Sequence, residues 1–111
     1  MLTYALIVFA IAAVGGLVLA AHVLRGKFAP WVLSLLHAAL GATGLVLLII
    51  TLMQGAPQLI LIGFALLLIA ALGGFFLASL HLRERLPPKA VVGIHAGAAV
   101  AGFLILLSQT L

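Results

Sequence analysis

Four long apolar runs, separated only by short turns, constrain this chain more than any other feature of its sequence. They cover about residues 2–24, 30–53, 58–82 and 88–110, and some 20 apolar residues suffice for a helix to cross a bilayer. The chain is 68% hydrophobic and 5% charged, whereas soluble domains average roughly 45–50% and 25%. The sequence therefore predicts an all-α membrane protein with four transmembrane helices, a single domain over residues 1–111 surrounded by the lipid bilayer.

The second half of the chain repeats the first with an offset of 58 residues, the separation of His37 and His95. About residues 11–53 form one unit and 69–111 the other, each with two apolar runs around a basic turn. Identical positions include Ile11/Ile69, Gly15/Gly73, Gly16/Gly74, Arg25/Arg83, Pro30/Pro88, His37/His95 and Gly44/Gly102. Short turns make sequence neighbours antiparallel, and two copies of a two-helix unit share one orientation. We expect an up-down-up-down bundle made of two parallel-repeat helical hairpins.

All five Lys and Arg residues lie in the turns 25–30 and 83–89. The positive-inside rule puts both turns in the cytoplasm and both termini outside, and we expect a bacterial inner membrane protein. The basic residues are not interleaved with aromatic ones as in single-strand binders, so no nucleic-acid partner is expected. The chain has no cysteine, which excludes disulfides, thiolate metal sites and covalently attached haem.

Each predicted helix carries one histidine toward its cytoplasmic end, and an ionisable residue inside a membrane span is a functional candidate by default. At about 1.5 Å per residue, His37 and His95 lie roughly 10 Å below the prolines that open their helices. A neutral imidazole at that depth needs a hydrogen-bond partner, which a carbonyl one turn back or Ser34 could supply. This deep pair, related by the repeat, is the stronger candidate for metal ligands.

His22 and His81 form a shallow pair, about 3–5 Å below the basic turns. At that level an imidazole can simply reach water or a lipid phosphate. These two histidines also break the repeat register, because His22 aligns with Leu80.

A glycine lies seven residues from each histidine, on its deeper side. These glycines are Gly15, Gly44, Gly74 and Gly102. Seven residues are close to two helical turns, so each glycine shares a helix face with its histidine. Close helix packing in membranes is one explanation of such stripes, but it does not explain why each stripe also holds a histidine. The alternative is a smooth wall beside a flat macrocycle that the histidines bind.

Neutral imidazoles bind haem iron, copper or zinc. Two axial histidines saturate a haem iron and suit electron transfer, and Arg25 and Arg83 lie at the level where anionic propionates need cations. Four imidazoles around one tetrahedral ion would need a common depth, but the two pairs differ by about 6 Å. No carboxylate lies within a span, so carboxylate-driven proton coupling is not expected.

A four-helix membrane unit with inward histidines on its spans and flanking glycines resembles the small b-type cytochromes of the cytochrome b561 kind. The resemblance covers the whole chain at the level of architecture, and it implies a haem b protein. Such proteins commonly hold two haems near opposite membrane faces, whereas here all histidines lie on one side, which favours one haem on His37 and His95. Two haems side by side, on His22 with His37 and on His81 with His95, are the alternative.

The first hypothesis is therefore an integral membrane haem b protein that transfers electrons near the cytoplasmic side, with quinone as a candidate partner. Whether it is an enzyme is left open. The second is a cofactor-free accessory subunit of a larger membrane complex, or a homo-oligomer, which the short loops and apolar outer faces allow. The third is a copper- or zinc-binding membrane protein, although no methionine or cysteine ladder accompanies the histidines.

Overall fold

The computed structural model describes residues 1–111 and is all-helical. Its helices are α1 (Leu2–Leu24), α2 (Trp31–Met53), α3 (Gln58–Leu82) and α4 (Lys89–Ser108). The all-helical prediction is confirmed, and the observed bounds differ from the expected ones by at most two residues. Pro30 and Pro88 precede their helices because their ψ angles, 135° and 139°, are extended, so each helix begins one residue later than expected.

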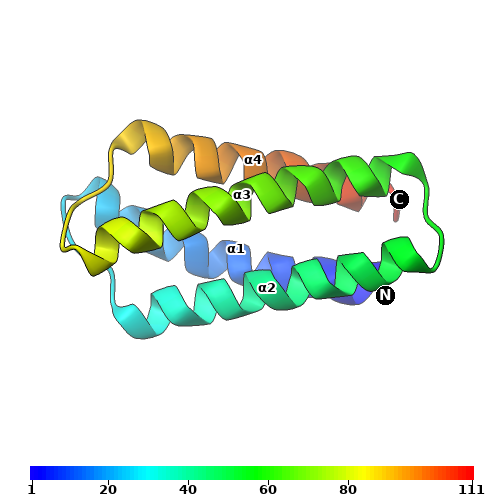
Figure 1. Ribbon diagram of the computed structural model, residues 1–111, viewed down its shortest axis with the longest axis horizontal. Coiled ribbons are helices and arrows are strands. Elements are labelled where there is room, and N and C mark those ends of the chain that lie inside the picture. Colours follow the sequence, from blue (N-terminus) through cyan, green and yellow to red (C-terminus); the bar gives the residue numbers. More distant parts are fainter.

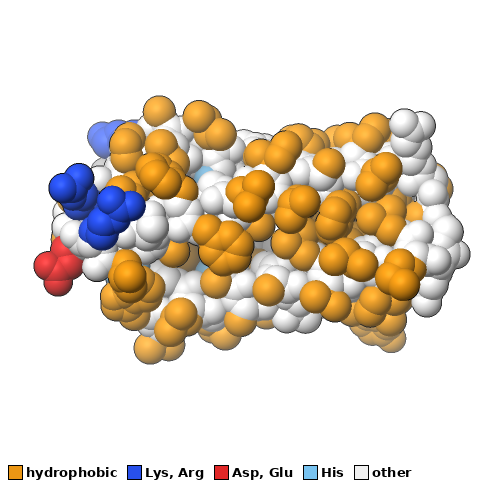
Figure 2. Space-filling model, in the orientation of Figure 1, with side chains coloured by type: hydrophobic (Ala, Val, Ile, Leu, Met, Phe, Trp, Pro, Cys, Tyr) orange, Lys and Arg blue, Asp and Glu red, His pale blue; other side chains and the backbone are white.

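Each of the four helices is long and apolar enough to cross a membrane. Only 14 of the 111 residues are buried, so most apolar side chains lie on the outside of the bundle. Figure 2 shows these side chains along the whole length of the visible face, with Lys and Arg gathered at one end. So large an apolar surface is unfavourable in water, and together with the four long apolar helices it indicates an integral membrane protein.

The four helices lie side by side along the long axis of the molecule (Figure 1), which measures 42 × 24 × 21 Å. Both termini lie at one end, and the turns that join α1 to α2 and α3 to α4 lie at the other. Helices α1 and α2 pack closely, as do α3 and α4, whereas α2 with α3 and α1 with α4 pack less extensively. No Cα atom of α2 lies within 8 Å of one in α4, so these two helices are diagonal neighbours.

The hydrophobic core occupies the half of the bundle near the termini. Its buried side chains are Ala5, Leu6, Phe9, Leu48, Ile60, Leu67 and Leu106. Leu48 and Leu106 are fully buried, and they are 58 positions apart. The four histidines all lie in the other half, nearer to the basic turns. The histidines and all five Lys and Arg residues thus lie in the half of the bundle away from this core.

Candidate functional site

His37 of α2 and His95 of α4 meet at the centre of the bundle in its histidine-containing half. Their ring centroids are 6.2 Å apart, and the ring planes are inclined by 75°. Both side chains are half-buried. Because no Cα atom of α2 lies within 8 Å of one in α4, the two imidazoles approach each other across the diagonal of the bundle.

Each of these imidazoles is held by a carbonyl group of the neighbouring helix. His37 Nδ1 donates a hydrogen bond to the Ala12 carbonyl oxygen of α1 at 2.8 Å, and His95 Nδ1 donates one to the Ala70 carbonyl oxygen of α3 at 2.6 Å. A carbonyl oxygen can only accept, so the proton of a neutral ring lies on Nδ1 and Nε2 keeps its lone pair. Such a bond is typical of metal-ligating histidines, because it fixes both the tautomer and the ring orientation.

The partners of the deep histidines differ from those considered at the sequence level. The carbonyls belong to the adjacent helix and not to the preceding turn of the same helix. Ala12 and Ala70 are themselves buried, and they are 58 residues apart, like the histidines they bind. The only sequence feature that marks these two acceptors is the repeated Ile-Ala-Ala motif at 11–13 and 69–71. A backbone carbonyl can accept a hydrogen bond whatever the side chain, so residue type alone does not identify the acceptor.

Two glycines lie directly against the deep histidine rings. A Cβ atom added to Gly16 would lie 2.9 Å from His37 Cε1, and one added to Gly74 would lie 3.2 Å from His95 Cε1. Gly74 was a candidate at the sequence level, whereas Gly16, its repeat equivalent, was not. The absence of side chains at these two positions lets α1 and α3 approach the imidazoles closely.

The other candidate glycines make helix-packing contacts. Added Cβ atoms would lie 3.8 Å from Leu33 Cδ1 at Gly15, 2.5 Å from Phe9 Cζ at Gly44 and 2.9 Å from Leu67 Cγ at Gly102. Gly102 also faces the carbonyl oxygen of Gly63, 3.0 Å from its added Cβ atom, so α3 and α4 approach closely there. These contacts fit the packing interpretation of the glycine stripes.

The shallow histidines have separate surroundings. The His81 ring stacks on Trp31 with centroids 3.9 Å apart and planes inclined by 2°, and Phe28 stacks in parallel at 6.0 Å. Its Nδ1 atom lies 3.4 Å from the Ser34 hydroxyl oxygen. His81 therefore connects α3 of the second hairpin to α2 of the first. Its stacking on Trp31 explains the position of the ring without a bound metal.

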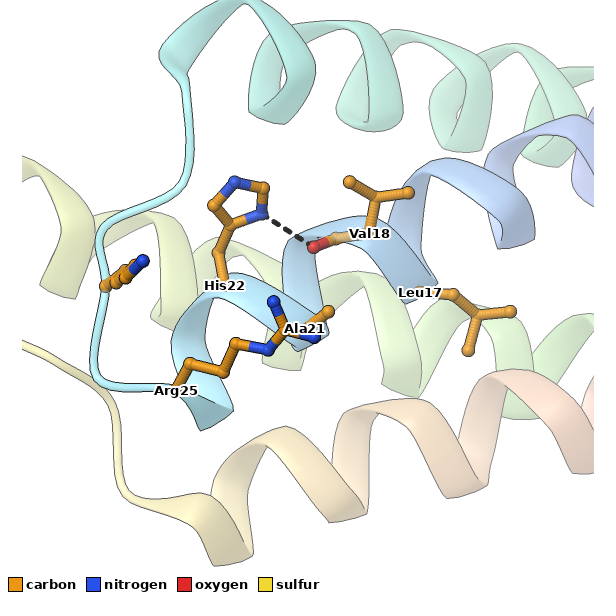
Figure 3. A pocket seen from close by; sticks show the side chains of 6 residues that line it. Leu17, Val18, Ala21, His22 and Arg25 are labelled. Carbon is orange, nitrogen blue, oxygen red and sulfur yellow. Dashed lines mark hydrogen bonds between the residues drawn. The ribbon is translucent and has the colours of Figure 1, made fainter.

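His22 Nδ1 donates to the Val18 carbonyl oxygen one turn back in α1, at 2.8 Å. Figure 3 shows this bond within a pocket on the outer side of α1 that Arg25 also lines. Arg25 and Arg83 are both exposed at the basic end of the bundle. The pocket beside Arg25 does not include His37 or His95.

No three His, Asp or Glu side chains lie close enough together to hold one metal ion. The structure thus brings together the deep pair, whereas His22 bonds Val18 of its own helix and His81 stacks on Trp31. With a metal–nitrogen distance of about 2.0–2.1 Å, two imidazoles on opposite sides of one ion have centroids about 6.3 Å apart. The 6.2 Å separation of the His37 and His95 rings is close to that value.

Comparison with known proteins adds no relative: no family model, no curated protein and no solved structure matches the chain.

Proposed function

We propose that this chain is an integral membrane haem b-binding electron-transfer protein, with His37 and His95 as the axial ligands. Its four helices form an up-down-up-down bundle of two parallel-repeat hairpins. Both basic turns face the cytoplasm of a bacterial cell and both termini lie outside, so the site is near the cytoplasmic side of the inner membrane. The resemblance to b-type cytochromes of the cytochrome b561 kind supports the same assignment.

The pair of identically held imidazoles carries this proposal. Each donates its Nδ1 proton to a buried alanine carbonyl, and each therefore keeps Nε2 as a free nitrogen donor. Two such rings with centroids 6.2 Å apart would supply two nitrogen ligands to one haem iron. That ligand set leaves no open position for a substrate, and it suits electron transfer rather than oxygen binding.

The chain supplies ligands, orientation and an apolar shell. Haem, when bound, supplies a one-electron ferric–ferrous couple. Ala12 and Ala70 orient the imidazoles through their carbonyl groups, and Gly16 and Gly74 let α1 and α3 pack directly against the rings. Arg83 is exposed at the basic end of the bundle, where anionic propionates would need positive charge. Arg25 instead lines a pocket on the outer side of α1 that does not include His37 or His95. A membrane-soluble quinone is the electron-transfer partner that such a location favours.

A structural role for the same histidines is the second candidate, and one observation favours it. Each Nδ1–carbonyl bond joins the two helices of one hairpin, α1 with α2 and α3 with α4. Hydrogen bonds between membrane helices stabilise by roughly 0.6 kcal/mol on average, so a cofactor-free subunit of a larger membrane complex can also use these bonds. A copper or zinc site receives less support, because only two donors converge and structural zinc requires four ligands.

An absorption spectrum distinguishes the two candidates. The chain should be produced in cells supplied with a haem precursor, extracted in mild detergent, and measured before and after reduction with dithionite. The proposal expects a Soret band and, on reduction, the sharp visible bands of a six-coordinate low-spin haem. A folded, helical protein that shows no Soret band, and gains none when haemin is added, would leave the structural role as the function.

A further inference from the structure

A second polar site lies on the outer side of α1, away from the histidine pair. It is a pocket of about 390 Å³ whose lining residues are Leu17, Val18, Ala21, His22, Arg25 and Lys27. The three apolar residues come first along the helix and the three basic ones follow. Figure 3 shows Leu17 and Val18 further inside the span than His22 and Arg25.

The end of α1 folds so that Lys27 returns toward the helix. Gly26 adopts a left-handed backbone with φ of 75°, and the amides of Arg25 and Lys27 both donate to the His22 carbonyl oxygen, at 3.1 and 2.9 Å. Glycine favours this conformation because it has no Cβ atom. The turn thus brings Lys27 beside Arg25, and two cations border the same pocket.

Both cations lack a nearby acid in their own turn. The single acid of the chain is Glu84, which lies in the second turn and borders a different pocket, with Phe28, Trp31 and His81. His22 adds a third polar group, since its Nδ1 bonds Val18 and its Nε2 is left free. The group that complements this rim is a phosphate, which accepts hydrogen bonds from both basic side chains.

The apolar half of the pocket indicates that the phosphate belongs to a lipid and not to a free anion. Leu17 is 72% exposed and Val18 43% exposed, and both lie inside the predicted span, where an acyl chain covers them. Lys and Arg side chains immediately cytoplasmic of a transmembrane helix attract anionic headgroups, and the proposed orientation places Arg25 and Lys27 there. We propose that this pocket binds one anionic phospholipid, with its phosphate on Arg25 and Lys27 and an acyl chain along Leu17 and Val18.

The second basic turn provides an internal comparison. Its backbone is similar: Glu84 has φ of 56°, and the Arg85 amide donates to the Leu80 carbonyl oxygen at 2.9 Å. However, Leu80 stands where the first turn has His22, and the acid Glu84 stands where it has Gly26. The second turn therefore has two arginines on a similar backbone, with an acid between them and no histidine at that position.

Native mass spectrometry of the haem-free full chain tests the site and does not depend on haem binding. The protein is mixed with phosphatidylglycerol or phosphatidylcholine of identical acyl chains, and the lipid-bound fraction is measured. Wild type should retain phosphatidylglycerol preferentially. The double variant R25Q/K27Q should lose this preference by roughly 10- to 30-fold, as expected for about 1 kcal/mol per basic residue, whereas R83Q/R85Q should keep it. R25K/K27R, which preserves both charges, should bind as wild type does.

Three outcomes would overturn the proposal. The first is equal retention of the two lipids by wild type. The second is an equal loss in R25Q/K27Q and R83Q/R85Q, which would show a general effect of interfacial charge. The third is displacement of phosphatidylglycerol by millimolar inorganic phosphate, which would identify a site for free phosphate. Circular dichroism of each variant confirms that the helices are retained.

Discussion

The imidazole of His37 lies 6.2 Å from that of His95, centroid to centroid, although their helices share no close backbone contact. Each ring is fixed within its own hairpin, by Ala12 in the first and by Ala70 in the second. The hairpins therefore set the orientation of the rings, and the packing of one hairpin against the other sets the distance between them. Substitutions can therefore test the orientation of the rings and the distance between them separately.

Replacing either deep histidine with alanine should abolish haem binding while the bundle remains folded. The substitution removes one axial ligand, so affinity should fall by more than about 100-fold, beyond the usual effect of losing a group that only supports a ligand. The lost interhelical hydrogen bond costs only roughly 0.6 kcal/mol. Haem content per protein, from the Soret absorbance, and helicity, from circular dichroism, should be measured on His37→Ala and His95→Ala.

His22→Gln is the matched control, because His22 bonds its own helix and lies apart from the deep pair. It should retain the haem content of wild type. If His22→Gln and His81→Gln each lose haem while the deep variants retain it, the ligands are the shallow histidines. If haem content falls by half in all four variants, the arrangement of two haems side by side is the better account.

Gly16→Ala should weaken haem binding because it displaces the His37 ring, although His37 itself remains in place as a residue. The new Cβ atom would lie 2.9 Å from Cε1 of His37, so the ring must rotate or α1 must shift. Loss of a group that orients a ligand typically costs 10- to 100-fold in affinity. Haemin titration should show this decrease, together with an altered low-spin signal in electron paramagnetic resonance.

Gly41→Ala is the control for that experiment, since no heavy atom lies within 4 Å of its added Cβ position. It places the same methyl group on α2, one turn deeper than His37, and should leave the titration unchanged. Equal effects of the two substitutions would mean that Gly16 does not act through the His37 ring.

Gly44→Ala should destabilise the bundle without selectively removing haem. Its Cβ atom would lie 2.5 Å from Cζ of the buried Phe9 ring, and overpacking of this kind costs about 1–3 kcal/mol. The free energy of unfolding, from titration with a denaturing detergent in mixed micelles, should fall by that amount. Gly97→Ala, which meets no heavy atom within 4 Å, should leave it nearly unchanged.

Adding Phe9→Leu to Gly44→Ala should recover part of the loss, because the smaller side chain makes room for the methyl group and neighbouring sites couple. If Gly44→Ala instead removes haem at unchanged stability, Gly44 is part of a wall beside the macrocycle, and the packing interpretation of this glycine is wrong.

The sequence predicted helix type and membrane character well because both depend on local composition. Runs of about 20 apolar residues and turns that contain proline define α1 to α4 almost to the residue. The side-chain environments were harder to predict. The Ser34 hydroxyl pairs with His81 and not with His37, Gly16 contacts a ring that Gly15 does not, and both deep histidines bond carbonyls of other helices. These contacts depend on the rotation of each helix about its axis, which an almost uniformly apolar sequence specifies weakly.

Single-cysteine labelling should establish the orientation, and the absence of cysteine from the chain makes every introduced thiol unique. Phe28→Cys and Glu84→Cys place a thiol in each basic turn, and Gln54→Cys and Thr110→Cys place one at the opposite end (Figure 1). None of these changes removes a Lys or Arg, so the charge bias that sets topology is preserved. A membrane-impermeant maleimide added to intact spheroplasts should label positions 54 and 110, and it should label 28 and 84 only after lysis. The reverse pattern would move the histidine pair to the outer side of the membrane, whereas labelling of 28 without 84 would contradict the parallel arrangement of the hairpins.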